Sequence, residues 1–294
     1  MRLFLKISAV FTMIFLVLAP AANSLSNERL QVAASIAPLH SLVSGVTHGV
    51  NETVLIVPAG ESPHEFSMKP SQMKKITEAK AVFFVSKGLE TFLHNPLRSL
   101  PAGVAKAEVA EISGITLLKN STGQNDPHVW LSPKNAEKIV RTAAKWMARI
   151  NPRQRNVYKK NARETIKKLK KLDATIRKEV AGVSDIPYAV FHDAYRYFES
   201  EYSMNGIGSI TENPEIPQSA AGLKHIRAKI RESGAVCVFS EPQYSEKRMR
   251  AAAEGSGART AFLDPLGVGI EPGPNLYFEM MENLARSLKN CLSN

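Results

Sequence analysis

Three histidines and one aspartate occupy positions from which distant parts of a chain can converge. His64 lies in the segment GESPHEF after an apolar run, and His128 lies in DPHVWLSP just before a helical pattern. His192 ends the apolar run YAVFH, and Asp264 closes the run TAFLDP. Three imidazoles and one carboxylate suit a four-coordinate zinc ion, because imidazole favours zinc, copper or nickel over magnesium or calcium. The set predicts a metal site, with ordinary surface or packing histidines as the alternative.

These residues follow the ends of predicted strands and helices. Apolar runs alternate with helical patterns in both halves of the chain, which predicts parallel sheets. Ligands bind beyond the carboxyl ends of strands in open parallel sheets, so the four side chains are expected to share one cleft. The predicted strands are 30–35, 52–60, 81–86, 188–192, 235–241 and 260–265, with 115–118 as a possible further strand. The predicted helices are 38–46, 70–78, 219–232, 246–254, 274–289 and one that begins after the Ser132 cap.

One long helical pattern, from Asn151 to Gly182, divides the chain. Asn151 can cap the helix, Pro152 suits its first turn, and Gly182 can end it. Apolar residues recur within it at spacings of three and four, which favours a single amphipathic helix over a coiled-coil strand. We therefore expect an α/β protein with two parallel-sheet lobes, residues 25–150 and 183–294, joined by helix 151–182, with the metal site in the cleft between them.

The other four histidines lie in segments that do not indicate a metal site. His40 lies in the helical stretch APLHSLV, His48 in a turn, His94 before Asn95-Pro96, and His225 on a basic amphipathic helix. We expect surface or packing roles for them.

Residues 1–24 resemble a secretory signal peptide. Arg2 and Lys6 precede the apolar run 7–18, and small residues follow it. Cleavage is expected between Ala21 and Ser26, and the apolar run is short for a membrane-spanning anchor. No cysteine follows the run, which argues against a lipoprotein anchor. The mature chain is therefore expected in an exported, oxidising compartment such as the periplasm.

The positive charge is concentrated on the long helix. The chain carries a net charge of +11, and loss of the two cations of residues 1–24 leaves 36 basic against 27 acidic residues, or +9. Segment 151–182 alone has eleven Lys/Arg against three Asp/Glu, or +8. Such a strip could bind nucleic acid, anionic lipid or an acidic partner. Aromatic residues are absent from it apart from Tyr158, so a solvated face without nucleic acid is favoured.

The chain has two cysteines, Cys237 and Cys291, 54 residues apart. In an oxidising compartment such a pair is more often a disulfide than two free thiols. A disulfide here would connect the C-terminal helix to a core strand. The spacing offers no CxxC zinc motif.

Five segments resemble the signatures of the metal-binding proteins that feed ABC importers, above all the periplasmic zinc-binding, ZnuA-like branch. They are SPHEFSMKPSQ, DPHVWLSP, VFHDAYRYF, FSEPQYS and LDPLG, in that order, and the resemblance covers nearly the whole mature chain. It implies His64, His128 and His192 as zinc ligands, with Asp264 or a water molecule completing the site. Manganese-type relatives usually have glutamate where this chain has His192.

The chain also departs from its relatives. Many zinc-type members have a long His- and acid-rich loop before the second ligand, whereas segment 119–126 is short and lacks histidine. A secondary, metal-collecting site is therefore not expected. Pro63 also stands where some relatives place a glutamate before the first histidine.

The resemblance implies a monomeric binding protein that captures zinc between its lobes and delivers it to a membrane ABC permease. The alternatives are a manganese- or iron-type binding protein, a metal-dependent adhesin and, least favoured, a zinc hydrolase. Three histidines and water also describe catalytic zinc, and Glu65 or Glu241 could serve as a base. The sequence lacks HExxH, however, so no enzymatic activity is expected.

Overall fold

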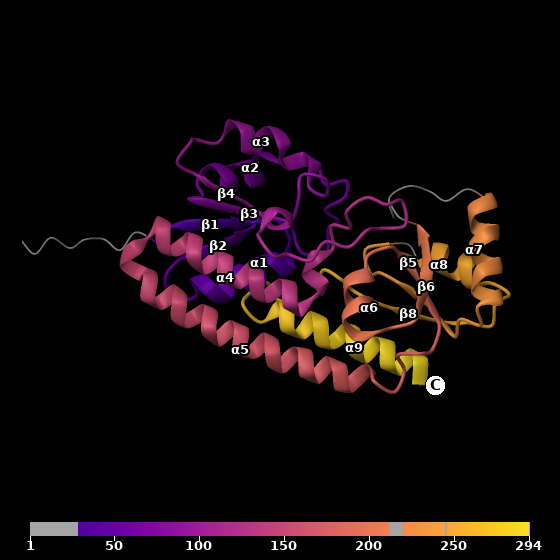
Figure 1. Cartoon of the computed structure of the whole chain (residues 1–294). Helices are drawn as coiled ribbons and strands as arrows, with labels where there is room; N and C mark the ends of the chain where they lie inside the picture. Colours follow the sequence, from indigo (N-terminus) through magenta and orange to yellow (C-terminus); the bar gives the residue numbers. More distant parts are fainter. Residues whose placement is uncertain (1–28, 212–219, 245, 294) are drawn as a thin grey trace, which may run out of the picture.

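The computed structural model describes residues 29–211, 220–244 and 246–293. The predicted signal peptide and the predicted helix start at Ser219 lie outside these ranges. Two four-stranded parallel sheets form two lobes, with α5 and α9 running beneath both (Figure 1). The first sheet has the order β2-β1-β3-β4 and the second the order β6-β5-β7-β8. The strands are β1 (Gln31–Ala34), β2 (Glu52–Leu55), β3 (Ala81–Phe84), β4 (Ala105–Glu108), β5 (Tyr188–His192), β6 (Gly206–Thr211), β7 (Cys237–Ser240) and β8 (Arg259–Phe262). The predicted α/β architecture of two parallel-sheet lobes is confirmed.

Helices connect the strands and cover the sheets. The α-helices are α1 (Ala37–Thr47), α2 (Pro70–Thr77), α3 (His94–Ser99), α4 (Pro133–Ile150), α5 (Arg155–Val180), α6 (Arg196–Tyr202), α7 (Ala220–Glu232), α8 (Glu246–Ala253) and α9 (Leu276–Ser293). Short 3-10 turns are η1 (Thr91–Leu93), η2 (Val109–Glu111), η3 (Val129–Leu131) and η4 (Pro152–Gln154). The Ser132 cap of α4 is confirmed, because its Oγ accepts a hydrogen bond from the backbone N–H of Asn135 at 3.2 Å. None of the helices in these ranges is long and apolar enough to span a membrane.

Two strands differ from the sequence prediction. The fourth strand of the first lobe is β4, and the expected Ile115–Leu118 is irregular loop. β4 has the sequence AKAE, whose alternation of apolar and polar residues is too short and too weakly apolar to indicate a strand. In the segment 115–118, the backbone N–H of Leu118 donates to the hydroxyl of Tyr197 and not to a neighbouring strand. β6 was not predicted, because its sequence GIGSIT contains two glycines, which are poor strand formers.

The long helix is shorter than predicted. Asn151 ends α4 by donating its backbone N–H to the carbonyl of Met147, and Pro152–Gln154 form a separate 3-10 turn. α5 therefore begins at Arg155, and its 26 residues span about 39 Å rather than about 45 Å. The chain reverses direction between α4 and α5. Asn151, which ends α4, therefore cannot also begin α5.

The two lobes share one hydrophobic core. It runs from Val32 of β1 through Tyr158 and Ile176 of α5 to Met280 of α9. Hydrogen bonds also cross between the lobes: the indole N–H of Trp130 donates to the carbonyl of Pro265 at 2.8 Å. The hydroxyl of Tyr277 donates to the carbonyl of Trp130 at 2.7 Å. The lobes are therefore held together by more than the connecting helix.

The disulfide predicted between Cys237 and Cys291 is present, with its Cα atoms 6.3 Å apart. It joins β7, a central strand of the second sheet, to the last turns of α9. The expected connection between the C-terminal helix and a core strand is confirmed.

Candidate metal centre

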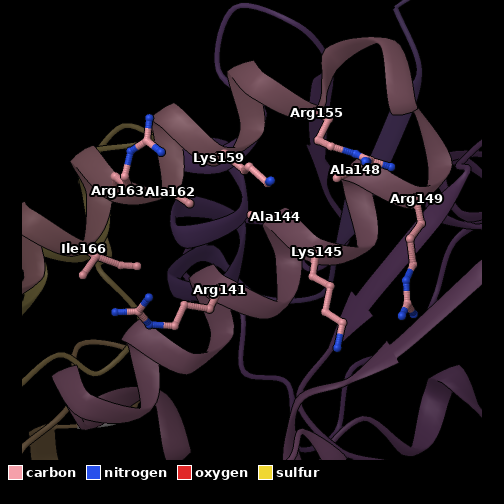
Figure 2. Close-up of a pocket in the computed structure, with 10 residues that line it drawn as sticks. All are labelled: Arg141, Ala144, Lys145, Ala148, Arg149, Arg155, Lys159, Ala162, Arg163 and Ile166. Carbon is pink, nitrogen blue, oxygen red and sulfur yellow. The ribbon is translucent and has the colours of Figure 1, made fainter.

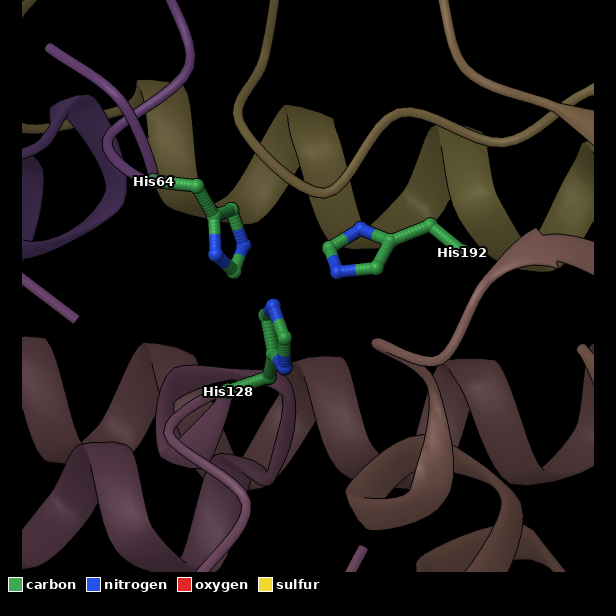
Figure 3. A group of neighbouring side chains, drawn as sticks. All are labelled: His64, His128 and His192. Carbon is green, nitrogen blue, oxygen red and sulfur yellow. The ribbon is translucent and has the colours of Figure 1, made fainter. Parts of the chain in front are cut away.

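Three histidines from three separate segments converge between the lobes (Figure 3). His64 lies in the loop after β2, His128 directly precedes η3, and His192 is the last residue of β5. One ring nitrogen of each lies within 4.8 Å of those of the other two. A tetrahedral zinc ion with Zn–N bonds of about 2.0–2.1 Å needs nitrogens about 3.3 Å apart, so small side-chain adjustments suffice.

His128 is oriented by a carboxylate two residues before it. Asp126 Oδ1 lies 2.7 Å from Nδ1 of His128 and also accepts the backbone N–H of His128 at 2.9 Å. Both side chains are buried. Since an ionised carboxylate only accepts hydrogen bonds, Nδ1 carries the proton and Nε2 presents a lone pair. The backbone turn DPH therefore fixes both the ring and its tautomer.

His192 has an equivalent partner from a neighbouring strand. Its Nδ1 lies 3.1 Å from Oε1 of Glu241, which follows β7. The same oxygen accepts the hydroxyl of Tyr195 at 3.2 Å. The other ring nitrogen of His192, Nε2, is buried and has no hydrogen-bond partner among the described residues. A buried acceptor without a partner is costly unless something binds it, which fits a metal ion.

His64 is the least constrained ring of the three. Its ring centroid lies 4.9 Å from that of His192 and 5.6 Å from that of His128. Burial, followed by the nearby imidazoles of His192 and His128, lowers the pKa of His64 well below its usual value. A neutral imidazole is the form that can bind a metal, and this environment favours the neutral form of His64.

Asp264 lies outside the group of three histidines. Its Oδ1 accepts the backbone N–H groups of Leu266 and Gly267, both at 3.0 Å, and the side-chain amide of Gln243 at 3.1 Å. Its Oδ2 accepts the backbone N–H of Val268. In this conformation the carboxylate organises the loop after β8.

A hydrogen bond joins the two lobes beside the centre. The hydroxyl of Tyr244, in the second lobe, donates to Oγ of Ser62, in the loop that carries His64, at 3.1 Å. A polar cavity of about 260 Å³ remains beside His64 and His128, lined also by Asn120, Gln124 and Asp193. Two of the three imidazoles therefore adjoin a cavity whose lining is mainly polar.

The remaining histidines lie away from this centre. His40 is buried, and its Nε2 is 2.8 Å from the carbonyl of Thr53, which is a packing role. His48, His94 and His225 are exposed. Sequence reasoning considered Glu241 only as a base for an enzyme and did not consider Asp126, although each lies in a segment that it quoted, FSE and DPH.

Two α/β lobes with a histidine-lined centre buried between them define a metal-binding solute-binding protein. The chain belongs to the family described as "Zinc-uptake complex component A periplasmic", whose profile matches residues 32–291. It is therefore a periplasmic zinc-binding component of an ABC importer and not an enzyme.

Relatives and solved structures agree with this assignment. The chain is 36% identical over 314 residues to the high-affinity zinc uptake system protein ZnuA of Brucella suis biovar 1 (strain 1330), covering 92% of this chain and 94% of that protein. The corresponding protein of Yersinia pestis is 28% identical, with coverage of 92% and 94%. A crystal structure of ZnuA superposes with a TM-score of 0.80 at 26% identity, covering 90% of this chain and 99% of that one. A zinc-bound deletion mutant of ZnuA gives a TM-score of 0.79 at 25% identity, with coverage of 91% and 99%.

Proposed function

We propose that His64, His128 and His192 hold the transported zinc ion through one ring nitrogen each. The single observation that supports this most strongly is the unpartnered, buried Nε2 of His192 beside the two other imidazoles. The fourth position is proposed for a water molecule or, after the 264–268 loop rearranges, for Asp264. Its present hydrogen bonds favour water.

The ligand set also favours zinc over manganese. Three imidazoles supply borderline nitrogen donors, whereas manganese prefers carboxylate and other oxygen ligands. His192→Glu would convert the set to two nitrogens and a carboxylate. Competition titrations should show the zinc-to-manganese affinity ratio falling for this variant. An unchanged ratio would mean that His192 does not bind the metal.

Zinc content tests the site directly. Protein isolated from its own periplasm should contain one zinc per chain by elemental analysis. His64→Ala, His128→Ala and His192→Ala should each reduce this content after dialysis, whereas His94→Ala, on the exposed surface, should not. Full zinc retention in all three ligand variants would refute the assignment.

The affinity should also depend on pH. Protons compete with zinc for imidazole nitrogens, so affinity should fall as the pH drops below about 6.5. Because burial lowers the pKa of His64, this ring stays neutral to lower pH, and the decline should continue well below 6.5. Isothermal titrations between about pH 5 and 8 check this. A constant affinity across that range would argue against histidine ligation.

We further propose a monomer without affinity for nucleic acid, which passes zinc to the permease after cleavage of residues 1–24. The division into lobes 25–150 and 183–294 around segment 151–182 is part of this proposal. The placement of one sheet before α5 and the other after it supports the division. Mass spectrometry of the exported protein, together with light scattering, tests both cleavage and oligomeric state.

A further inference from the structure

A groove of about 490 Å³ runs between α4 and α5, apart from the metal centre (Figure 2). Its floor is apolar and buried, formed mainly by Ala144, Ala148 and Ala162. Small residues let two helices approach to about 8 Å, which leaves a shallow channel above the contact. All the polar residues that line this channel are arginines or lysines.

The cations form two rows. Arg141, Lys145 and Arg149 follow one another at every fourth position of α4, and Arg155, Lys159 and Arg163 do so on α5. Each row therefore has a spacing of about 6 Å. The η4 turn makes the two helices antiparallel. Counted along the chain, the pairs Arg149 and Arg155, Lys145 and Lys159, and Arg141 and Arg163 are each centred on the start of that turn. The two rows therefore lie on opposite sides of the alanine floor, and the side chains of Lys145 and Arg149 extend away from α5 (Figure 2).

Most of these cations have no ion-pair partner within the described ranges. Arg141 has an ion-pair partner, Glu137, with Nη2 and Oε2 3.6 Å apart. No carboxylate of the described ranges lies within ion-pair distance of the other five cations. All six side chains are exposed. Like charges held close together repel, so an anion that lies between the rows relieves this repulsion.

The spacing indicates the shape of that anion. In an extended polypeptide, alternate side chains point to opposite sides, and residues two apart on one side are about 6.6–6.8 Å apart. Six consecutive acidic residues would therefore place three carboxylates along each row, close to the helix repeat of about 6 Å. A flat membrane surface matches less well, because its headgroups would meet the cations without reaching the recessed floor.

We propose that the α4–α5 groove is a docking site for an extended acidic segment of a partner protein. The recognition is electrostatic, with each row of cations meeting one edge of the segment and the alanine floor receiving its backbone. The site is independent of the metal centre, so docking and zinc binding can be measured separately.

The test uses N-acetylated, C-amidated hexaglutamate carrying a fluorophore, with binding to the intact protein followed by fluorescence anisotropy. The variant Lys145→Glu/Lys159→Glu reverses the middle of both rows. The matched control, Lys170→Glu/Lys171→Glu, makes the same change in net charge on exposed α5 positions that do not line the groove. A second peptide, acetyl-(Glu-Ala)6-amide, has the same number of carboxylates, but an extended chain presents them on one side only.

We expect saturable binding that the groove variant weakens at least about tenfold, while the control weakens it less than about threefold. The alternating peptide should bind at least about fivefold more weakly than hexaglutamate. Zinc affinity should be unchanged in both variants, which separates this proposal from the assignment of the metal site. If Lys145→Glu/Lys159→Glu does not fold, Lys145→Ala/Lys159→Ala replaces it.

Three results would overturn the proposal. The first is no saturable binding of hexaglutamate by the unaltered protein. The second is an equal loss in the groove and control variants, which would mean attraction by net charge alone. The third is binding to phosphatidylglycerol vesicles that depends on Lys145 and Lys159 when hexaglutamate does not bind, which would assign the groove to a membrane surface.

Discussion

The two lobes have the same strand order but contribute to the metal centre in different ways. The first lobe supplies two histidines from loops, and the carboxylate that orients one of them, Asp126, lies two residues away. The second lobe supplies one histidine at a strand end, oriented by Glu241 from the adjacent strand, 49 residues away. A local turn thus fixes a histidine in one lobe, and the pairing of strands fixes a histidine in the other.

This difference indicates where the preorganisation of the centre comes from. His192 depends on the register between β5 and β7, which pairs Tyr188 with Cys237 and Val190 with Phe239. His64 lies in a loop, and no carboxylate within the described ranges hydrogen-bonds its ring, which contacts the imidazoles of His128 and His192 instead. Each lobe therefore has one histidine held by a carboxylate, His128 in the first and His192 in the second, whereas His64 is held only by its loop.

The largest expected effect tests the contribution of each lobe. Structural zinc sites have apparent binding free energies of about 10–16 kcal/mol, so one of four ligands is worth about 2.5–4 kcal/mol. His192→Ala removes the imidazole of the second lobe and should weaken zinc binding about 1000-fold, whereas His64→Ala should weaken it about 100-fold. Competition with a chelator measures both. A larger loss for His64→Ala would reverse the comparison.

The disulfide sharpens the comparison through stability. It lies in the second lobe only, and Cys237→Ser/Cys291→Ser should lower the free energy of unfolding by roughly 2–4 kcal/mol, because a long loop becomes unrestrained in the unfolded chain. Denaturant titration of the metal-free protein gives this value. Zinc affinity should change less than the stability does. A parallel loss of affinity would show that the bond also positions His192.

The next-largest effect is expected from changing the carboxylates that orient the histidines. Changing such a partner typically costs about 10–100-fold in metal affinity. Glu241→Gln should lie at the upper end of this range, because Glu241 also holds the hydroxyl of Tyr195, and Asp126→Asn at the lower end. Zinc titrations of both variants decide the order. Equal losses would indicate that the two lobes orient their histidines equally well.

The smallest expected effect concerns Asp264. Its oxygens accept three backbone N–H groups and one amide, so Asp264→Asn should weaken zinc binding less than about tenfold, chiefly by loosening the 264–268 loop. The zinc affinity of this variant, measured beside that of Glu241→Gln, provides the check. A loss as large as that of His64→Ala would make Asp264 a direct ligand and give the second lobe two.

Much of this organisation was predictable from the sequence. His192 and the Ser132 cap stand at recognisable element ends, and the long amphipathic pattern required one helix between two α/β halves. What could not be predicted depended on tertiary contacts. β4 is recognisable only because β3 pairs with it, and the partnership of His192 with Glu241 exists only once β5 and β7 lie side by side.

The start of α5 illustrates a second limit. Asn151 and Pro152 form a pattern typical of a helix start, but in the structure Asn151 is the C-cap of α4. Local preference indicated a helix boundary correctly, but it could not tell which of two helices the boundary belonged to.

The core shared by both lobes has a thermodynamic consequence. A protein whose halves swing widely apart buries new apolar surface when it closes on its ligand, and this appears as a large negative heat-capacity change. Here the Trp130–Pro265 and Tyr277–Trp130 hydrogen bonds, together with α5 and α9, already join the halves. Calorimetry at several temperatures should therefore give an enthalpy of zinc binding that is almost independent of temperature.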